Sequence, residues 1–416
     1  MESHATHPDV ELDVTNMAHG GVGVARLDGR VVFVADAIPG ERVRARVTDD
    51  RKSSFWRAEA VEVLDASPDR RPHVWAEAGI DRDPAERAGG AEFGHITLER
   101  QRALKADVLE DSLRRFARLE RRTEVEAVAG DDERDGLNWR TRVRVHIDAD
   151  GTVGPFASRS HRVVAVAEHP LATAAIGEAL PRQMDASVGD WIDAVETSDG
   201  RVRTTIGRGN ERLPAETIRE RVGDREFRLD AGGFWQVHRG AAATLTALVG
   251  EVLDDALLDP RAANLDLYGG VGLLAAALGD RVGPGLRITS VEADAGATDH
   301  AAENLSDWVG ARAVTARTDR FLREEIAQAG AAERDRMRRA SVVLDPPRQG
   351  AGREVVRALV EMAPAQLVYV ACDPVALARD LGFFAEGGYE LRTLRAVDLF
   401  PHTHHLESIA LLVPRS

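Results

Sequence analysis

The N-terminal part of the chain has the hydrophobic pattern of a small β-domain. Between residues 10 and 65, short runs rich in β-branched residues are separated by turn-forming pairs. Several short strands in so short a segment predict a small β-barrel, for which binding of single-stranded RNA is a common use. The segment "DASPDRRP" (65–72) has the composition of a linker, so we expect a first domain over residues 1–66. The turn-forming pairs are Gly20-Gly21, Asp28-Gly29 and Pro39-Gly40.

A mixed pattern follows in the middle of the chain. Residues 97–119 carry apolar side chains at helical spacing. Arginine-rich strands are predicted over 138–170, then an alanine-rich helix near 171–180 and further strands to about residue 230. We therefore expect a central, strand-rich α+β domain over residues 67–235.

From Asn264 onward the pattern changes to apolar strands that alternate with helical stretches, after a first helical stretch from Thr244 to Leu258. This alternation is typical of a doubly wound α/β domain with a mainly parallel sheet. The predicted strands are 264–268, 286–291, 341–345 and 366–371.

Composition favours a soluble, cytoplasmic protein. The 416 residues suffice for two or three domains, and 44% of them are apolar. No apolar run reaches the roughly 20 residues that span a bilayer, and the acidic, polar start of the chain is unlike a secretory signal. Nothing in the sequence requires more than a monomer.

The charge balance argues against a broad nucleic-acid surface, because the net charge is −15 and phosphate binding needs cations. The segment 138–162 departs from that balance, with five arginines against two aspartates. It is a candidate phosphate-binding surface, although a solvated strand face accounts for the charges equally well. The arginines are Arg140, Arg142, Arg144, Arg159 and Arg162.

A glycine turn follows the first strand of the α/β segment. In "NLDLYGGVGLLAAAL" (264–278), Gly269, Gly270 and Gly272 allow backbone amides to approach a ligand. The next strand ends in Glu292, where an acidic side chain binds the ribose diol in dinucleotide and S-adenosylmethionine sites. The spacing GxGxxG is absent, so S-adenosylmethionine is favoured over NAD; an ordinary strand–helix turn is the alternative.

Asp345 ends another apolar strand, in "VVLDPPRQGAG" (342–352). Open α/β sheets bind ligands at the carboxyl ends of their strands. Pro346 and Pro347 prevent the strand from continuing. Asp345 is therefore a candidate ligand-binding residue, and a purely structural helix cap is the alternative.

The single cysteine of the chain, Cys372, also lies between an apolar strand and a predicted helix, in "YVACDPVALARDL" (369–381). Asp373 can cap that helix and Pro374 suits its first position. A thiol at a helix N-terminus is expected to ionise more easily, because the helix dipole stabilises the thiolate. Cys372 is thus a candidate nucleophile; a buried, inert cysteine is the alternative.

Three histidines and one glutamate precede the last apolar strand, in "DLFPHTHHLESIALLV" (398–413). The histidine spacing matches no zinc signature, and no cysteine cluster supports a metal, so we expect no metal site. Glu407, at the start of the strand, is a candidate base in the same cleft as Cys372. The histidines are His402, His404 and His405.

In five ordered motifs the chain resembles the S-adenosylmethionine-dependent RNA uracil-C5 methyltransferases, which form 5-methyluridine in tRNA and 23S rRNA. The resemblance implies an N-terminal TRAM domain with an OB-like fold, a central RNA-binding domain, and a class I, Rossmann-like methyltransferase domain over 236–416. It also implies that the helix at 97–119 packs on the catalytic domain. The motifs are "GGFWQVH" (232–238), "DLYGGVGLL", "VVLDPPRQG", "ACDPVALARDL" and "FPHTHHLES".

The resemblance also implies roles for individual residues. Cys372 would add to C6 of the uracil, and Glu407 would remove the proton from C5. Asp319, in "ARTDRF", is expected at the end of the fourth strand, near the adenine of the cofactor. The full set of implied cofactor contacts is Gln236, Tyr268, Glu292, Asp319 and Asp345.

Many relatives hold an iron–sulfur cluster with four cysteines after the barrel, but the corresponding stretch of this chain has none, so no cluster is expected. Two other functions remain open. An amino-group methyltransferase also uses an Asp-Pro-Pro motif, although an aromatic residue typically follows it, where this chain has Arg348. A non-catalytic RNA-binding factor could keep the same scaffold. The RNA and the uridine that is modified cannot be identified from these motifs.

Overall fold

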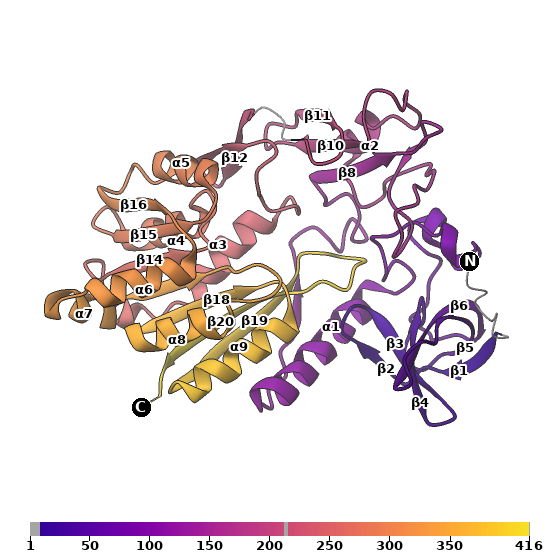
Figure 1. Cartoon of the computed structure of the whole chain (residues 1–416), viewed down its shortest axis with the longest axis horizontal. Helices are drawn as coiled ribbons and strands as arrows, with labels where there is room; N and C mark the ends of the chain where they lie inside the picture. The colour runs from indigo at the N-terminus through magenta and orange to yellow at the C-terminus, as the bar shows by residue number, and fades with distance from the viewer. Residues whose placement is uncertain (1–8, 212–214, 416) are drawn as a thin grey trace.

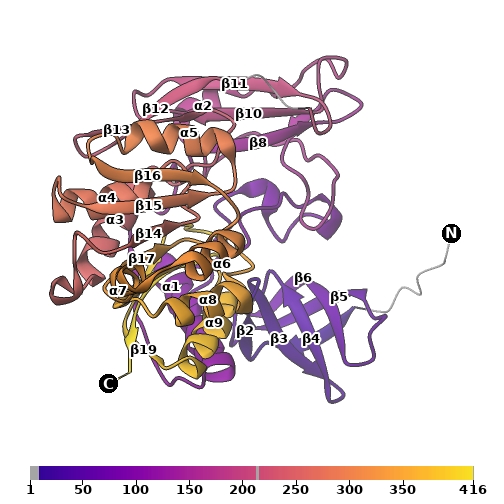
Figure 2. The same ribbon diagram turned by 60° about the vertical axis from the view of Figure 1, so that its left-hand side comes forward.

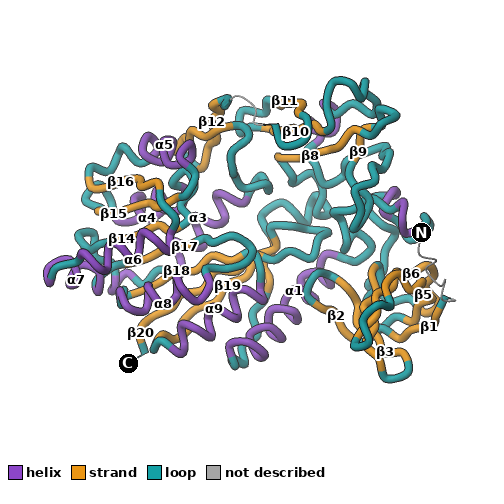
Figure 3. Tube along the Cα trace, viewed as in Figure 1, coloured by secondary structure: helices purple, strands orange, loops and turns teal. Residues whose placement is uncertain are grey.

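The computed structural model describes residues 9–211 and 215–415. Residues 1–8, which include part of the predicted first domain and of the polar N-terminus, lie outside the described residues. The strands form three groups around a common centre (Figures 1 and 2). Loops, coloured teal in Figure 3, occupy much of that centre. No helix in the described ranges has the length and apolarity that crossing a bilayer requires.

The first group is a curled six-stranded sheet in the order β1-β5-β6-β4-β3-β2. Alternate side chains such as Val32 and Val34 fill its interior. The predicted linker is anchored to this sheet, because Arg70 donates hydrogen bonds of 2.6 and 2.8 Å to the buried carboxylate of Glu41. The strands are β1 (Val10–Asp13), β2 (Asn16–Ala18), β3 (Val22–Leu27), β4 (Arg30–Ala35), β5 (Arg42–Asp49) and β6 (Phe55–Asp65).

The central group is a four-stranded antiparallel sheet in the order β11-β10-β8-β9, with a separate hairpin beside it. Helix α2 (Ala174–Ala179) covers the apolar face of this sheet. The hairpin leads into the loop that carries the predicted Gln236. The strands are β8 (Arg142–Ile147), β9 (Val153–Gly154), β10 (Trp191–Glu196) and β11 (Val202–Gly207), and the hairpin is β12 (Thr217–Val222) and β13 (Arg225–Asp230).

The third group is an eight-stranded sheet in the order β16-β15-β14-β17-β18-β20-β19-β7. Strands β14 to β18 are parallel, and β20 inserts antiparallel between β18 and β19. The chain runs outward from β14 to β16 and then returns to β17, so the strand order reverses between β14 and β17. Open α/β sheets bind their ligands at this switch point.

Helices cover both faces of this sheet (Figure 1), as expected for a doubly wound fold. Its strands are β14 (Asn264–Leu267), β15 (Arg287–Glu292), β16 (Gly310–Thr315), β17 (Ser341–Leu344), β18 (Gln366–Ala371), β19 (Tyr389–Asp398) and β20 (Glu407–Pro414). Its helices are α3 (Ala241–Val252), α4 (Leu273–Val282), α5 (Ala295–Asn304), α6 (Thr318–Gln328), α7 (Ala331–Arg338), α8 (Gly352–Met362) and α9 (Pro374–Glu386).

Two elements from the middle of the chain belong to this third group. Helix α1 (Leu98–Ser112) ends in one π-helical turn (Leu113–Ala117), and this region packs against α9. Strand β7 (Val125–Ala127) extends the sheet beside β19. The middle of the chain therefore contributes elements to the eight-stranded sheet as well as to the central one.

A buried ion pair connects α1 to the sheet. Lys105, one of two lysines in the chain, donates a 2.5 Å hydrogen bond to Asp398 at the end of β19. Both side chains are 1% exposed. Loss of either partner would leave the other charge buried and unpaired, which is strongly destabilising, so this pair fixes where α1 docks.

Candidate active site

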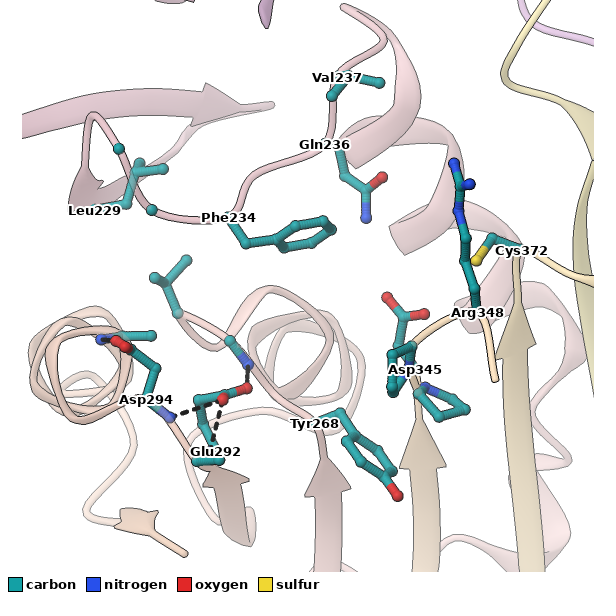
Figure 4. Close-up of a pocket in the computed structure, with 18 of the residues that line it drawn as sticks. Leu229, Phe234, Gln236, Val237, Tyr268, Glu292, Asp294, Asp345, Arg348 and Cys372 are labelled. Atoms are coloured by element: carbon teal, nitrogen blue, oxygen red, sulfur yellow. Dashed lines mark hydrogen bonds between the residues drawn. The ribbon is translucent and has the colours of Figure 1, made fainter. Parts of the chain in front are cut away.

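One cavity of about 1980 Å³ opens at the carboxyl ends of the parallel strands. All seven residues predicted for the site line it, together with residues of the central sheet. Figure 4 shows Glu292, Tyr268 and Asp345 on neighbouring strand ends, with Gln236 opposite and Cys372 beside Arg348. The predicted residues are Gln236, Tyr268, Glu292, Asp319, Asp345, Cys372 and Glu407.

The glycine turn and Glu292 form one end of the cavity. The Glu292 carboxylate accepts hydrogen bonds from the backbone amides of Gly270 at 3.1 Å and Asp294 at 2.9 Å. Gly270 has φ +53° and open space where a Cβ would lie, so its backbone faces the cavity. A glycine turn beside an acidic strand end is the arrangement that holds a nucleoside, so these residues fit S-adenosylmethionine.

Asp266 supports the glycine turn through hydrogen bonds, and the sequence analysis did not single it out. It is fully buried in β14 and accepts hydrogen bonds from the Ala275 amide and the Ser290 hydroxyl, each 3.2 Å long. A Cβ at Gly269 would lie 2.1 Å from the Ser290 Oγ and 2.7 Å from the Asp266 carboxylate. An aspartate inside the apolar strand "NLDL" was the available signal, because an unpaired charge is costly to bury.

The structure corrects the predicted place of Asp319. It lies in the first turn of α6, after β16, which is the third strand of the run that begins at Asn264. The predicted alternation omitted β16, because this edge strand, "GARAVT", is largely exposed and has no continuous apolar run. Asp319 nevertheless lines the cavity.

Cys372 and Glu407 are brought together by strand pairing. Strands β18 and β20 are antiparallel, and their last registered pair is Ala371 with Ser408. Extended one residue beyond the end of β18, this register would set Cys372 opposite Glu407. Side chains directly opposite each other on antiparallel strands point to the same face, with Cβ atoms about 5 Å apart. A thiol and a carboxyl therefore face the cavity as neighbours.

The thiol does not ionise as easily as the helix dipole alone suggested. Burial, together with the nearby carboxylates of Glu407 and Asp345, raises the pKa of Cys372 to about 12, although Arg348 opposes this shift. Burial likewise raises the pKa of Asp345 to about 7, and that of Glu407 well above its usual value. Burial and the acidic surroundings thus favour the neutral thiol.

This environment predicts slow alkylation of Cys372 in the folded enzyme. A thiol whose pKa is about 12 has almost no thiolate at pH 8. We expect iodoacetamide to react roughly 30-fold more slowly than with the urea-unfolded chain, since higher thiolate nucleophilicity offsets part of the loss. The rate should rise with pH up to at least pH 10 without a plateau. Mass spectrometry can follow the reaction, and a plateau near pH 8 would contradict the raised pKa.

A second prediction concerns Glu292. Glu292→Gln should raise the Kd for S-adenosylmethionine about 10- to 100-fold, because charge-assisted hydrogen bonds contribute about 1.5–3 kcal/mol. Isothermal titration calorimetry measures this directly. The matched control is Glu324→Gln, because Glu324 is an exposed residue of α6 whose carboxylate accepts from Arg320. Equal affinities for both variants would remove Glu292 from the cofactor site.

The predicted arginine surface is mostly neutralised. Arg144 is held by Asp193 through two 2.6 Å hydrogen bonds, and three other arginines of the segment have acidic partners. Among the described residues, no carboxylate lies within ion-pair distance of Arg140, which lines the cavity. Sequence counting could not detect partners that lie far away along the chain. The other pairs are Arg142–Glu220, Arg159–Glu59 and Arg162–Glu86.

Arg142 also holds one loop of the cavity wall in place. It donates hydrogen bonds to the carbonyl oxygens of Ala231 at 3.1 Å and Gly233 at 2.8 Å. These residues begin the loop that presents Gln236 to the cavity, and Phe234, with 73% of its surface exposed, projects from the same loop (Figure 4). Exposed aromatic rings at a cleft are stacking surfaces for bases, so Phe234 is a further candidate that the sequence analysis did not single out.

Within the described ranges, no group of three or more metal-ligating side chains is placed to hold an ion. His402 hydrogen-bonds Gln101 and the carbonyl oxygen of Asp135, which ties the last loop to α1. His405 lies 3.2 Å from Arg348 at the cavity wall.

Comparisons with known proteins identify the family of the chain. Residues 9–61 match the family model of the TRAM domain, and residues 221–415 match that of tRNA (Uracil-5-)-methyltransferase. A Streptomyces avermitilis protein described as an uncharacterized RNA methyltransferase is 38% identical, over 98% of both chains. The 23S rRNA (uracil(1939)-C(5))-methyltransferase RlmD of Chromohalobacter salexigens is 32% identical, over 96% of this chain and 88% of that one.

Among solved structures, the tRNA (uracil-54, C5)-methyltransferase of Pyrococcus abyssi, in complex with S-adenosyl-L-homocysteine, superposes with a TM-score of 0.70. The match covers 97% of this chain and 99% of that one, at 21% identity, and shows the same fold. The predicted fold class, family and cofactor are thereby confirmed. The chain belongs to the S-adenosylmethionine-dependent RNA uracil-C5 methyltransferases that carry an N-terminal TRAM domain.

Proposed function

We propose that this enzyme methylates C5 of a specific uridine in 23S rRNA or tRNA through a covalent bond between Cys372 and C6 of the base. The observation that carries the proposal is that Cys372, which follows β18, and Glu407, which begins the adjacent antiparallel strand β20, both line the cavity. The same cavity contains the glycine turn and Glu292. A nucleophile, a base and a cofactor site therefore face one space.

The chemistry explains why both side chains are needed. C5 of uracil is a poor nucleophile until a thiolate adds to C6 and moves the double-bond electrons toward C5. S-adenosylmethionine, when bound, supplies the methyl group that C5 attacks. Glu407 then accepts the C5 proton, the C5–C6 double bond re-forms, and the bond between C6 and the Cys372 sulfur breaks.

The surroundings of Glu407 suit a base of this kind. It is 4% exposed, and burial with the neighbouring Asp345 raises its pKa well above the usual value. A carboxylate with a raised pKa binds a proton more strongly at neutral pH, which favours its removal from carbon. The Cys372 thiol must lose its own proton first, and Arg348 favours that loss.

The target uracil has to leave its RNA helix or loop to reach this cavity. Extruding a nucleotide costs a few kcal/mol of stacking, which new contacts must offset. Phe234 offers an aromatic face, and Arg140 offers a cation with no carboxylate at ion-pair distance in the described part of the chain. We assign Arg140 to a backbone phosphate of the target nucleotide.

This assignment makes a testable contrast between two arginines. Arg140→Ala should lower kcat/KM about 10- to 100-fold, the value of a charge-assisted hydrogen bond, and should reduce the slope of log Kd against log salt by about one. Arg144→Ala, whose guanidinium is held by Asp193, should change either quantity less than about threefold. Fluorescence titration with RNA at several salt concentrations measures both. Identical behaviour of the two variants would contradict the assignment.

The reaction itself can be tested by isotope release. Unmodified 23S rRNA and tRNA transcripts labelled with tritium at uridine C5 would be incubated with S-adenosylmethionine. Methylation at C5 must release tritium to water in equal amount to the methyl groups transferred. Methyl transfer without tritium release would indicate an amino-group methyltransferase, and neither signal would indicate a non-catalytic RNA-binding factor. Release from only one transcript identifies the substrate.

A further inference from the structure

The N-terminal sheet reaches the catalytic residues through one short turn. His19 and Gly21 lie in the turn between β2 and β3, and Figure 2 shows β2 beside α9. The His19 Nε2 atom lies 3.2 Å from the Asp373 carboxylate. Asp373 directly follows Cys372 and is the N-cap residue of α9.

The same turn also contacts the segment that leads to Glu407. A Cβ at Gly21 would lie 2.7 Å from the His404 Cβ and 3.1 Å from the Phe93 ring, so only glycine allows this approach. The φ angle of Gly21 is +71°, which also favours glycine. One turn of the N-terminal domain thus contacts the chain beside both proposed catalytic residues.

Asp373 is held from two sides. One oxygen of its carboxylate accepts hydrogen bonds from the amides of Val375 at 3.0 Å and Ala376 at 2.8 Å, which begin α9. The other oxygen faces His19. The contact raises the pKa of His19, and hydrogen bonds from His19 and from the helix amides lower that of Asp373 against the effect of burial. Both shifts favour the charged form of the pair, an imidazolium facing a carboxylate.

We propose that His19 is a positioning residue of the methyl-transfer site: by holding Asp373 it fixes the strand end that carries Cys372. This inference rests on the proposed role of Cys372. It makes the TRAM domain part of the catalytic machinery as well as an RNA-binding module. The Asp373 charge also disfavours the Cys372 thiolate, so the facing imidazolium partly offsets that effect.

The single cysteine allows a test that needs neither RNA nor methyl transfer. His19→Ala should slow iodoacetamide alkylation of Cys372 about two- to threefold, because the Asp373 charge that disfavours the thiolate is then no longer offset. His19→Gln carries no charge and should restore little of the alkylation rate. Its amide can donate to Asp373, however, so it should restore most of the rate of adduct formation, which reports positioning. The matched control is Arg26→Ala, an exposed residue of the same domain whose guanidinium contacts Gly29; it should leave the rate unchanged.

A second set of measurements separates positioning from RNA binding. His19→Ala should slow formation of the covalent adduct with 5-fluorouridine RNA by a similar factor while the Kd for RNA stays within twofold of wild type. Asp373→Asn keeps the helix cap and removes the charge, so His19→Ala should have little further effect in that background. Matching thermal unfolding midpoints would exclude misfolding.

The outcomes distinguish the two proposals. Weaker RNA binding by His19→Ala with normal alkylation and normal adduct formation would overturn the positioning role. If His19→Ala alters alkylation but the wild type forms no adduct, the contact between His19 and the Cys372 segment is supported and the proposed uracil chemistry is refuted.

Discussion

Cys372→Ala is expected to abolish RNA methylation while binding of S-adenosylmethionine and RNA stays within about threefold of wild type. Without the sulfur, C5 of the uracil is not activated, and loss of a covalent nucleophile typically lowers kcat by about 10³-fold or more. The side chain is a small part of a cavity of about 1980 Å³, so its loss should not disturb either binding site. Initial rates of methyl incorporation would measure the effect.

RNA that contains 5-fluorouridine gives a second, qualitative result. Fluorine cannot leave as a proton does, so the wild-type enzyme should be trapped as an adduct that survives denaturing gel electrophoresis. Cys372→Ala should give no shifted band. Cys372→Ser serves as the near-isosteric control and should also fail, because serine ionises far less easily. Methylation by the serine variant at the wild-type rate would favour the amino-group methyltransferase.

Glu407→Gln should have a different signature, since it blocks the second half of the reaction. The amide cannot accept the C5 proton, so the methylated adduct should accumulate on ordinary RNA that contains no fluorine. Turnover should fall by about 10²- to 10⁴-fold, the usual contribution of a general base. A denaturing gel should show a shifted band for this variant and none for the wild type.

The matched control is Glu390→Gln, an exposed glutamate at the start of the neighbouring strand β19. It should show wild-type turnover and no trapped species. If Glu407→Gln turned over normally, the base would have to be another group of the cavity, and Asp345, with a pKa of about 7, would be the next residue to replace.

Much of this site was predictable because it lies where elements end. An apolar strand that stops at a polar residue is visible in sequence, and the parallel sheet then gathers such residues at one edge. Asp345, Glu292 and Cys372 were found in this way, and all three line the cavity.

Other features depend on contacts between distant segments. Burial, together with Glu407 and Asp345 from other strands, raises the pKa of Cys372, and the local sequence shows none of these contacts. The arginines of the central sheet are neutralised by partners that only folding brings near, such as Glu59 for Arg159. Helix α1 joins the catalytic body through Lys105 and Asp398, which are almost 300 positions apart.

The strand register described above also bears on how such enzymes can change during evolution. The separation of Cys372 and Glu407 depends on the backbone pairing of β18 with β20. It does not depend on the length of the chain between the two residues. Insertions and deletions in α9 or in the loop before Glu407 can therefore accumulate in descendants without separating the two residues. A single-residue insertion between Glu407 and Ser408 would turn the carboxyl to the opposite face of the sheet. Length variation within the family should thus be common in the connections and absent from β20.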